Sequence, residues 1–319
     1  MKTCIIIATK DRKHDLFEAI ESIEKQTHKP DELIIVDAST NQDLERELMT
    51  DFSNQRISYI HTEPGLSKQR NIGIRAGSGE VIFFFDDDVV LERNYINSIL
   101  KVFENDERGE IGAVMGRIMR RPMSLKVKIK RLIAHALNKL FLLDDSGDGR
   151  FKLSGLATHP HHMNQPKYIE CLTGCCMAFK REVFANLEFD ENLVLYSMMD
   201  DYDISKGLLN LGYKIFYEPA AKLLHKRSPT SRLNKYHIKR MWVVNHYYLF
   251  RKYWRQTPLT NVAFWWSIIG MVLSSLYSPQ GIRGMMAGIL DILKARGKLV
   301  RTAKKLKYEE SSYKVIPVK

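Results

Sequence analysis

The first 118 residues alternate between short apolar runs and longer amphipathic segments. Apolar runs of four or five residues, typical of buried strands, occur at 4–8, 33–36, 57–60, 81–85 and 111–115. Segments with helical periodicity lie between most of these runs, at 13–26, 41–52, 67–76 and 92–105. Because strands alternate with helices, this part of the chain is expected to form an α/β fold with a mixed, mostly parallel sheet.

Polar clusters follow three of the predicted strands. They are Thr9-Lys10-Asp11-Arg12, Asp37-Ala38-Ser39 and Asp86-Asp87-Asp88. The carboxyl ends of parallel strands meet at one edge of the sheet, which is where ligands of open α/β sheets bind. We therefore expect the three clusters to meet in one binding site.

The third cluster is unusual, because three phenylalanines run directly into three aspartates in FFFDDDVV. Adjacent carboxylates repel one another, and their desolvation is costly unless cations or hydrogen-bond donors compensate. A solvated turn or a helix N-cap after the strand would explain the aspartates, and so would a metal site. If residues 86–88 remain extended, Asp86 and Asp88 point to the same side.

The alternation of strands and helices breaks at 120–165. Basic and apolar positions interleave at 125–143, which predicts a basic amphipathic helix, and a polar loop follows it. Strand-like and helical patterns resume at Tyr168 and continue to about Leu224, after which aromatic, basic and apolar helices are expected. The predicted domains are therefore 1–228, with an insertion at 120–165, and a helical region at 229–319.

The chain is basic, and its charge is uneven. It has 319 residues, with 49 Lys and Arg against 37 Asp and Glu, and the excess is concentrated at 117–131, 222–255 and 294–307. Such segments suit polyanions, including nucleic acid, anionic lipid and sugar nucleotides. The four cysteines do not form a disulfide framework in a chain of this size. The apolar N-terminal stretch is too short for a signal peptide, which predicts a cytoplasmic protein or one on the cytoplasmic face of the membrane.

Several motifs taken together carry a family resemblance. GLSKQRNIGIRAGSGEVIFFFDDDVV resembles the nucleotide-sugar half of family 2 glycosyltransferases, and IIIATKDR and LIIVDAS match the first two strands of that family. YIECLTGCCMAFKREVF, FDENL, DDYDISKGLLNLGYKIFYEP and AAKLLH then follow in the family's order, so the resemblance covers roughly residues 3–230. It implies the GT-A fold, a nucleotide-diphosphate sugar donor and, usually, inversion at the anomeric carbon.

The resemblance implies a metal site on the donor side. Asp86 and Asp88 occupy the outer positions of the family's Asp-x-Asp motif, so Asp88 would bind the metal and Asp86 would reach the metal or the ribose. His225 matches a histidine that approaches the metal or the diphosphate, although it could also cap the chain beside Lys226 and Arg227. Mg²⁺ or Mn²⁺ is the expected ion, because both accept carboxylate and phosphate oxygens.

Further nucleotide contacts follow from the same resemblance. Asp37 ends the second strand at the position of the family's base-binding aspartate, and Thr9 and Arg70 fall on other nucleotide-contacting positions. Asp11 and Asp87 are expected to bind the nucleotide sugar as well. Arg70 could equally pair with Asp11 or with another nearby carboxylate.

The acceptor side needs a general base. Asp200, Asp201 and Asp203 lie at the predicted start of a helix, where carboxylates cap free N–H groups and favour the helix dipole. Capping explains one aspartate more readily than three. The family has a Glu-Asp pair here and its second member is the base, so the resemblance assigns the base to Asp201 and places Asp200 in the position of the glutamate.

A zinc site is a competing interpretation of the histidines and cysteines in the second half of the domain. Adjacent cysteines on a strand would face opposite ways and no CxxC pair exists, which argues against zinc. The residues concerned are His159, His161, His162, Cys171, Cys175 and Cys176.

The C-terminal region favours a membrane surface. Residues 261–277 contain no charge, but 17 residues are at the short limit for a membrane span. Trp265 and Trp266 lie in this run, as interfacial anchors often do. A peripheral or monotopic helical module on the cytoplasmic face of the plasma membrane is expected. A buried helical hairpin packed on the catalytic domain is the alternative.

The motifs and the C-terminal region together predict an inverting transferase of bacterial surface polysaccharide synthesis. It would use a UDP- or dTDP-sugar and a glycan or lipid-linked acceptor. A nucleic-acid-binding protein would leave the ordered aspartates unexplained, so no nucleic acid is expected. The intact acidic positions argue against a catalytically inactive binding protein with the GT-A fold.

Overall fold

The computed structural model divides the chain into two compact units. Unit 1 consists of Met1–Arg120 and Pro160–Ser231, and unit 2 of Arg121–His159 and Arg232–Lys319. Most of the segment predicted as an insertion into the catalytic domain is therefore grouped with the C-terminal helices. The structure describes residues 1–40, 43–52, 56–119, 135–143, 147–161, 163–194, 196–230 and 233–294.

Some sequence predictions lie outside these described residues. They include the first ten positions of the basic helix expected at 125–143, together with His162 and the basic tail from residue 295 onward. Of the expected basic helix, residues 135–140 are described and are helical.

The described part of unit 1 is built on one sheet of nine strands. The order is β3-β2-β1-β4-β8-β6-β9-β5, and β7 pairs with β9. β3, β2, β1 and β4 are mutually parallel, β8 runs antiparallel to β4 and β6, and β6 and β9 are parallel. The strands are β1 Thr3–Thr9, β2 Glu32–Asp37, β3 Ile57–His61, β4 Val81–Asp86, β5 Val89–Leu91, β6 Ile111–Met119, β7 Lys167–Ile169, β8 Cys176–Lys180 and β9 Lys214–His225.

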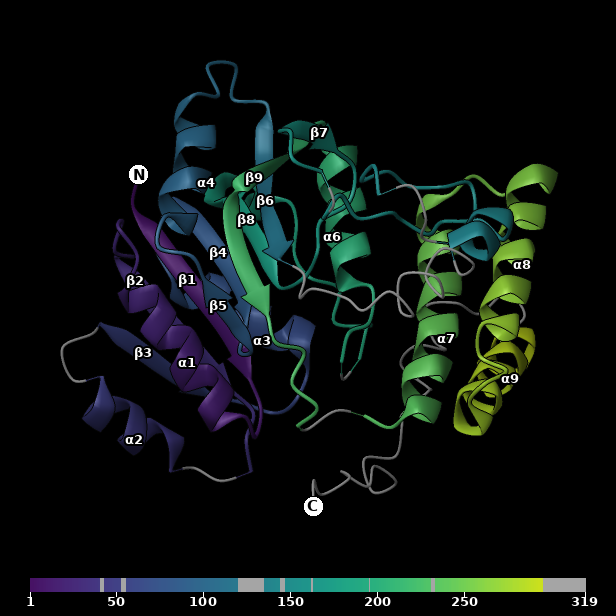
Figure 1. The fold of residues 1–319 in the computed structure, drawn as a ribbon, viewed down its shortest axis with the longest axis horizontal. Helices are drawn as coiled ribbons and strands as arrows, with labels where there is room; N and C mark the ends of the chain where they lie inside the picture. Colours follow the sequence, from purple (N-terminus) through teal and green to yellow (C-terminus); the bar gives the residue numbers. More distant parts are fainter. Residues whose placement is uncertain are drawn as a thin grey trace. The chain divides into compact units, whose positions relative to one another are not determined.

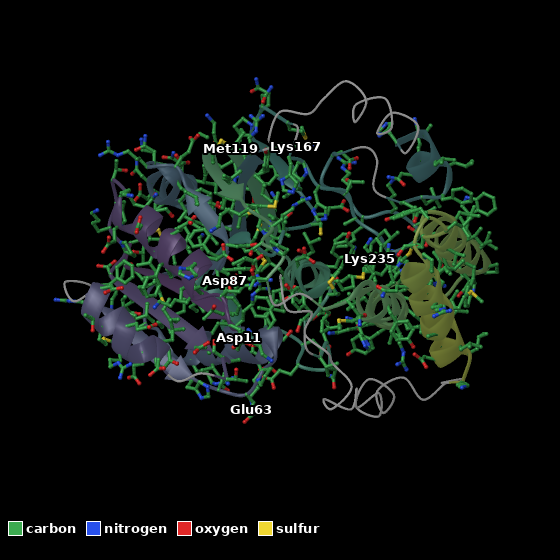
Figure 2. The ribbon with its side chains drawn as sticks, turned by 60° about the horizontal axis from the view of Figure 1, so that its bottom comes forward. Asp11, Glu63, Asp87, Met119, Lys167 and Lys235 are labelled. Carbon is green, nitrogen blue, oxygen red and sulfur yellow. The ribbon has the colours of Figure 1, made fainter. Side chains whose placement is uncertain are left out.

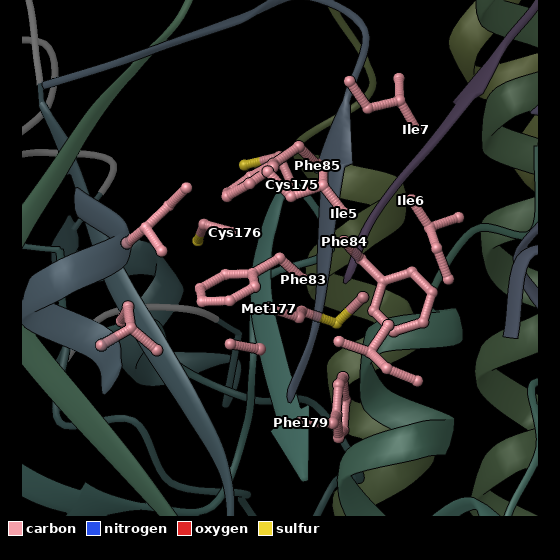
Figure 3. Close-up of a cluster of buried hydrophobic side chains, with 14 of the residues drawn as sticks. Ile5, Ile6, Ile7, Phe83, Phe84, Phe85, Cys175, Cys176, Met177 and Phe179 are labelled. Carbon is pink, nitrogen blue, oxygen red and sulfur yellow. The ribbon is translucent and has the colours of Figure 1, made fainter. Parts of the chain in front are cut away.

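Helices cover both faces of this sheet (Figure 1). Alternate side chains of β4 point to opposite faces, as the pleat requires. Phe85 packs against Tyr95 of α4, with ring centroids 5.4 Å apart, whereas Phe84 packs against Phe179 and Phe189. Figure 3 shows the two groups of rings on either side of β4. The helices are α1 Lys13–Glu24, α2 Leu44–Asp51, α3 Leu66–Ala76, α4 Tyr95–Glu104, the 3₁₀ helix η1 Arg181–Ala185 and α6 Asp200–Asn210.

A glycine sets how closely α3 approaches the sheet. A Cβ at Gly73 would lie 2.4 Å from the Ile6 side chain of β1. Such a contact is impossible without a shift of helix or strand, so glycine is required for the close packing.

The expected α/β architecture with flanking helices is confirmed, and so is the meeting of strand ends. Thr9 is paired with Asp37 across β1 and β2, and Ala8 is paired with Asp86 across β1 and β4. The three polar clusters therefore begin side by side at one edge of the sheet.

One predicted helix begins later than the pattern indicates. The segment expected to be helical from 92 starts as α4 at Tyr95, and the short strand β5 precedes it. β5 pairs with the end of β9, where Val89 lies opposite His225. A contact between residues so far apart in the sequence leaves no local periodicity to detect, which is why the strand was not predicted.

Unit 2 contains a group of helices in which α9 packs along α7. These helices are α7 Lys235–Tyr253, α8 Pro258–Leu273 and α9 Pro279–Lys294. A Cβ at Gly284 would lie 2.2 Å from the Tyr236 carbonyl oxygen, so the glycine permits a close helix crossing. Within the described residues, no helix combines the length and the apolar character that crossing a membrane would require.

Candidate active site

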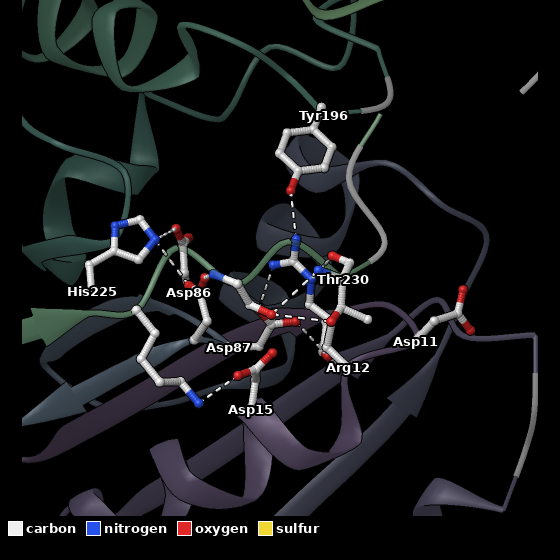
Figure 4. Close-up of polar contacts among 12 residues, drawn as sticks. Asp11, Arg12, Asp15, Asp86, Asp87, Tyr196, His225 and Thr230 are labelled. Atoms are coloured by element: carbon white, nitrogen blue, oxygen red, sulfur yellow. Dashed lines mark hydrogen bonds and ion pairs between the residues drawn. The ribbon is translucent and has the colours of Figure 1, made fainter. Parts of the chain in front are cut away.

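The carboxyl end of β4 brings two aspartates to one histidine. Asp86 is the last residue of β4, and Asp87 and Asp88 form the turn into β5 rather than continuing the strand. The turn still brings Asp86 and Asp88 together, since the Nε2 atom of His225 is 3.8 Å from Asp86 Oδ2 and 3.0 Å from Asp88 Oδ1. His225 is the last residue of β9 (Figure 4). The predicted metal ligands Asp86, Asp88 and His225 therefore form one cluster.

Charge and hydrogen bonding stabilise the ionised form of Asp88. Burial alone would raise the pKa of this carboxyl, but its contacts with His225 and the Ser228 N–H, at 2.8 Å, hold that pKa at about 2. Burial likewise opposes a charge on His225, whereas the neighbouring Cys175, Asp88 and Asp86 raise the pKa of the imidazole to about 11. Without a bound ion, the imidazolium therefore supplies positive charge that a divalent cation would replace.

The middle aspartate has a separate partner. Asp87 accepts a hydrogen bond from Thr9 Oγ1 at 2.9 Å and forms an ion pair with Arg12 at 3.0 Å. Arg12 also donates to the Tyr196 hydroxyl and to the Thr230 carbonyl, each at 2.9 Å (Figure 4). Burial raises the pKa of Asp87 to about 7 even though Arg12 opposes the rise. Asp87 thus fixes the loop between β1 and α1 and has no direct part in the His225 cluster.

Asp37 and Asp11 lie near a cavity of about 240 Å³. Asp37 is fully buried and accepts from the Ser39 hydroxyl at 2.6 Å and the Tyr59 hydroxyl at 2.8 Å. Figure 2 labels Asp11 and Asp87 in the same region of unit 1, following β1 and β4 respectively. The cavity is lined by Asp11, Arg12, Lys13, His14, Asp15, Ser39, Leu44, Glu47 and Thr230.

Arg70 connects Asp86, at the end of β4, with Asp200, at the start of α6. Its buried guanidinium forms an ion pair with Asp200, lies 3.4 Å from Asp86 Oδ1 and donates to the Gly174 carbonyl at 2.9 Å. The cation also lies 5.2 Å from the centre of the Phe189 ring. Arg70 therefore pairs with carboxylates of two distant motifs, and its predicted contact with the nucleotide stays a prediction.

Asp200 and Asp201 open α6, as expected. Met199, just before the helix, has a left-handed backbone with φ of 72°, a conformation that non-glycine residues seldom adopt away from functional sites. Asp201 Oδ1 accepts from the Tyr202 N–H at 3.0 Å, and Oδ2 lies 3.3 Å from the Gly174 N–H. Asp200 is buried beside Arg70, whereas Asp201 is partly exposed.

The two carboxyl groups hold protons more tightly than a solvated aspartate. Burial raises the pKa of Asp200 to about 7, although Arg70 acts in the opposite direction. Burial also raises the pKa of Asp201 to about 6, against the hydrogen bond from Gly174 and the charge of Arg70. A carboxylate with a raised pKa is a stronger proton acceptor than an ordinary aspartate, and Asp201, with the lower pKa of the two, is mostly ionised at neutral pH.

The residues weighed for a zinc site do not gather as a set. Among the described residues, the group of potential metal ligands is Asp86, Cys175 and His225, whose ligand atoms lie within 4.8 Å of one another. The thiols of Cys175 and Cys176 contact each other, and the Cys176 thiol also lies 3.7 Å from the Gly116 carbonyl. His159, His161, Cys171 and Cys176 belong to no such group in the part of the chain described.

The donor set fits a divalent cation. Asp86, Asp88 and His225 offer two carboxylates and an imidazole, which suit Mn²⁺ and, through the oxygens, Mg²⁺. Asp86 and His225 are partly exposed, so an ion held there would remain accessible to a phosphate. The observed geometry agrees with the predicted metal ligands, while occupancy by a metal stays a prediction.

Comparison with known proteins assigns the family. The sequence profile described as Glycosyl transferase family 2 matches residues 4–187, more than half of the chain. The chain belongs to glycosyl transferase family 2. The match begins in β1 and ends just after η1, so it includes the Asp86–Asp88 cluster and Arg70.

Relatives of this chain include proteins with assigned activities. The O-antigen chain rhamnosyltransferase WbaN of Salmonella anatum is 25% identical over 218 residues, which are 67% of this chain and 62% of that protein. The glucosyl-dolichyl phosphate glucuronosyltransferase of Haloferax volcanii is 29% identical over 33% of this chain and 35% of its own length. An uncharacterized glycosyltransferase of Rickettsia bellii is 30% identical over 33% of this chain. The matches cover between 15% and 62% of these three relatives.

Solved structures confirm the GT-A fold of the glycosyltransferase. GalNAc-T7 with UDP, GalNAc and Mn²⁺ has a TM-score of 0.59 at 14% identity, covering 95% of this chain and 58% of that one. The mannosyltransferase PcManGT from Pyrobaculum calidifontis, in complex with GDP-Man and Mn²⁺, has a TM-score of 0.53 at 16% identity and covers 97% and 79%. At these identities the likeness concerns the fold alone.

Several residues of the site were not assigned a role from the sequence. Arg12 lies in the first polar cluster, but its partners Tyr196 and Thr230 are about 200 positions away. Cys175 was weighed only as part of a zinc set, and Ser228 carried no motif. Arg12 could have been recognised as a candidate because it closely follows a predicted strand. Nothing in the sequence around Cys175 or Ser228 indicated their contacts.

Proposed function

We propose that this glycosyltransferase moves a sugar from a UDP- or dTDP-sugar to a hydroxyl of a glycan or lipid-linked acceptor, with inversion and with help from Mg²⁺ or Mn²⁺. The observation that carries the proposal is the chain of contacts from His225 through Asp86 and Arg70 to the Asp200–Asp201 pair. The buried guanidinium of Arg70 therefore holds both Asp86, in the proposed diphosphate site, and Asp200, next to the proposed base Asp201.

The proposed reaction is a single displacement. The acceptor oxygen attacks the anomeric carbon, its proton passes to a carboxylate oxygen of Asp201, and the bond from that carbon to the diphosphate breaks with its electron pair on the leaving oxygen. Attack opposite to the leaving group inverts the configuration. A divalent ion bound by Asp86, Asp88 and His225 would supply counter-charge to the departing diphosphate.

Asp200 is proposed to position rather than to accept the proton. Its carboxylate is buried and paired with Arg70, which keeps it from the surface that an acceptor hydroxyl could reach. Asp201 is partly exposed and bound only by backbone N–H groups in the contacts above. This difference supports Asp201 as the general base.

The cavity beside Asp11 and Ser39 is the proposed place for the nucleoside end of the donor. It lies next to Asp37 and at the carboxyl edge of β1 and β2, where ligands of such sheets bind. GalNAc-T7 binds UDP and PcManGT binds GDP-Man, which supports a nucleotide donor here without selecting the base. The O-antigen activity of WbaN supports a surface-glycan acceptor.

A panel of nucleotide sugars, assayed for metal-dependent release of the nucleoside diphosphate in the presence of lipid-linked glycan acceptors, tests the proposal. One donor should be consumed with Mn²⁺ or Mg²⁺ and the consumption should stop with chelator. Asp88→Asn keeps an acceptor for the Ser228 N–H but removes the negative charge that would bind the metal. The metal-dependent release of nucleoside diphosphate should therefore be lost. Asp31→Asn, which alters an aspartate bonded to Thr3 far from the site, is the matched control. Equal, metal-independent rates in the wild type and Asp88→Asn would exclude the metal role.

We also propose that unit 2 binds the cytoplasmic surface of a membrane without crossing it. Exposed apolar side chains recur on α8 and just beyond it at intervals of three and four, which places them on one helix face. They are Leu259, Val262, Trp266, Ile269, Leu273 and Leu276, here called the α8 stripe. Exposed cations Arg251, Lys252, Arg255, Arg283 and Lys294 accompany the stripe. Apolar insertion combined with basic flanks is typical of helices that lie in a lipid interface.

A further inference from the structure

Cys175 is an unexpected neighbour of Asp86 and His225. Its thiol is buried, and its sulfur lies within 4.8 Å of a ligand atom of both Asp86 and His225. It belongs to the loop before β8, next to the Phe83 and Phe85 side of β4 (Figure 3). A thiol is a poor ligand for Mg²⁺ and a good one for Zn²⁺ or Co²⁺, so its position changes which ion the cluster prefers.

We propose that Cys175 is a ligand of the metal site and that, through it, the site binds Zn²⁺ in preference to Mg²⁺. The inference rests on the proposed function, because it concerns the same metal site and the same Asp86 and His225. It adds a protein ligand and a class of ion that the Asp-x-Asp motif alone does not indicate.

The distances suit a tetrahedral ion after small side-chain movements. Zinc bonds of about 2.0–2.3 Å to nitrogen, oxygen and sulfur require ligand atoms roughly 3.3–3.8 Å apart. His225 Nε2 and Asp86 Oδ2 are already 3.8 Å apart, and the limit of 4.8 Å for the whole group leaves about 1 Å to close.

Three protein ligands leave one position open. Catalytic zinc sites commonly hold three side chains and keep the fourth position for water or substrate. The tetrahedral set is Cys175, Asp86 and His225, while Asp88 keeps its hydrogen bond from the Ser228 N–H and stays outside this set. The open position would accept a phosphate oxygen of the donor. The Cys175 thiol would release its proton to solvent as the ion binds, so no oxidant or other reactant is needed.

Cobalt binding in the absence of donor and acceptor tests the proposal directly. Co²⁺ reports thiolate ligation by a sulfur-to-metal charge-transfer band in the near ultraviolet. The full-length wild type and Cys176→Ser should both show this band, and Cys175→Ser should not. Cys176 is the matched control, because it is adjacent, buried and in contact with the Cys175 thiol, yet it does not belong to the group of potential ligands found among the described residues.

Competition with a zinc-binding dye gives the second readout. Cys175→Ser should weaken Zn²⁺ binding by about 10–100-fold or more, since loss of even an outer-shell partner of a metal ligand costs that much. Binding of Mn²⁺, measured by the spin resonance of the free ion, should change little, because carboxylates and imidazole hold it. Cys175→Ala repeats the measurement if the serine variant fails to fold, with circular dichroism as the check.

The outcomes separate this inference from the proposed function. A band that persists in Cys175→Ser, or zinc binding by the wild type without a band, shows that Cys175 is an ordinary buried thiol and overturns the inference. A band lost only in the Cys175 variants supports it even if no donor is consumed, in which case the proposed function alone fails. If the wild type transfers sugar with Mg²⁺ but shows no cobalt band, the proposed function stands and the inference about Cys175 fails.

Discussion

Asp200 and Asp201 are adjacent in the chain but differ in their surroundings. Asp200 is buried against Arg70, whereas Asp201 is partly exposed and accepts only from backbone N–H groups in the contacts described. From the residues alone the aspartates could also cap the helix, and it was the family resemblance that predicted Asp201 as the base. The structure adds a difference in access, because Asp200 is held in the interior by Arg70 whereas the partly exposed Asp201 can be reached by an acceptor hydroxyl.

Replacement of Asp201 by Asn distinguishes a base from a helix cap. Asp201→Asn keeps the size of the side chain and an acceptor for the Tyr202 N–H, but the amide cannot take a proton at neutral pH. Sugar transfer should fall by about 10²–10⁴-fold, the usual contribution of general-base catalysis. Donor binding and the melting temperature should stay near those of the wild type, since Asn caps a helix nearly as well as Asp. Unchanged transfer in this variant would mean that Asp201 is only a cap.

The pH dependence of transfer reports the same pair. Because burial raises both carboxyl pKa values, to about 6 for Asp201 and about 7 for Asp200, the base is lost to protonation as the pH falls through this window. The transfer rate should therefore rise with pH to a plateau, with a midpoint between about 6 and 7 that belongs to the interacting pair. Initial rates measured with saturating donor from pH 4.5 to about 8.5 cover the window. A midpoint near 4, that of a solvated aspartate, would contradict the assignment.

At the scale of secondary-structure elements, strands and their ends were predictable and the contacts between distant elements were not. β1, β2, β3 and β4 are continuous apolar runs, because both faces of a covered parallel sheet are buried. Their polar ends were expected to meet, because the carboxyl ends of parallel strands lie at the same edge of a sheet. β5 and the turn at Asp87 and Asp88 depend instead on pairing with β9, more than a hundred residues away.

The Arg12–Asp87 pair connects the start of α1 to the turn after β4. Both side chains are nearly inaccessible, at 9% and 5% exposure, so the charge of either one alone would be buried. Arg12→Ala should lower the free energy of unfolding by about 1–3 kcal/mol at neutral pH, since the hydrogen bonds of Arg12 are lost while Asp87, with its pKa of about 7, can bind a proton and so avoid part of the cost of an unpaired buried charge. Chemical denaturation of the wild type and the variant measures this difference.

A matched arginine provides the control for that measurement. Arg46 pairs with Asp43 on the surface of α2, with 77% and 51% of the side chains exposed. Arg46→Ala should change the stability by no more than about 0.5 kcal/mol, because exposed pairs contribute little. Equal effects of Arg12→Ala and Arg46→Ala would show that the buried pair does not stabilise the site. Asp87→Asn should partly rescue Arg12→Ala, since it removes the uncompensated charge.

At the scale of the whole molecule, the chain combines a family 2 catalytic unit with a helical unit of different composition. The sequence located the change near residue 228, and the compact units change at Ser231. The assignment of Arg121–His159 to the helical unit was not predictable from the composition. It depends on contacts such as that of Gly270 in α8, where a Cβ would lie 2.2 Å from the Phe141 side chain.

The α8 stripe gives the helical unit a surface suited to lipid. Its aliphatic members Val262 and Ile269 are 67% and 48% exposed, and they are separated by two helical turns on one face. Full burial of such a side chain contributes about 1.5–3 kcal/mol. Two charges placed on this face should therefore remove enough apolar transfer energy to weaken binding to vesicles at least about tenfold, since 1.4 kcal/mol corresponds to a factor of ten.

Co-sedimentation with phosphatidylglycerol vesicles tests the surface with a charge-matched control. The wild type should sediment with the vesicles, and the double variant Val262→Glu, Ile269→Glu should remain largely in the supernatant. The control is Met49→Glu, Leu211→Glu, which adds the same two negative charges at apolar positions of unit 1 that are 44% and 43% exposed. Both double variants change the net charge by the same amount, so a difference between them locates the lipid-binding surface at the α8 stripe. Binding that is equal in the two variants, or a wild type that does not sediment, would exclude insertion of this helix face.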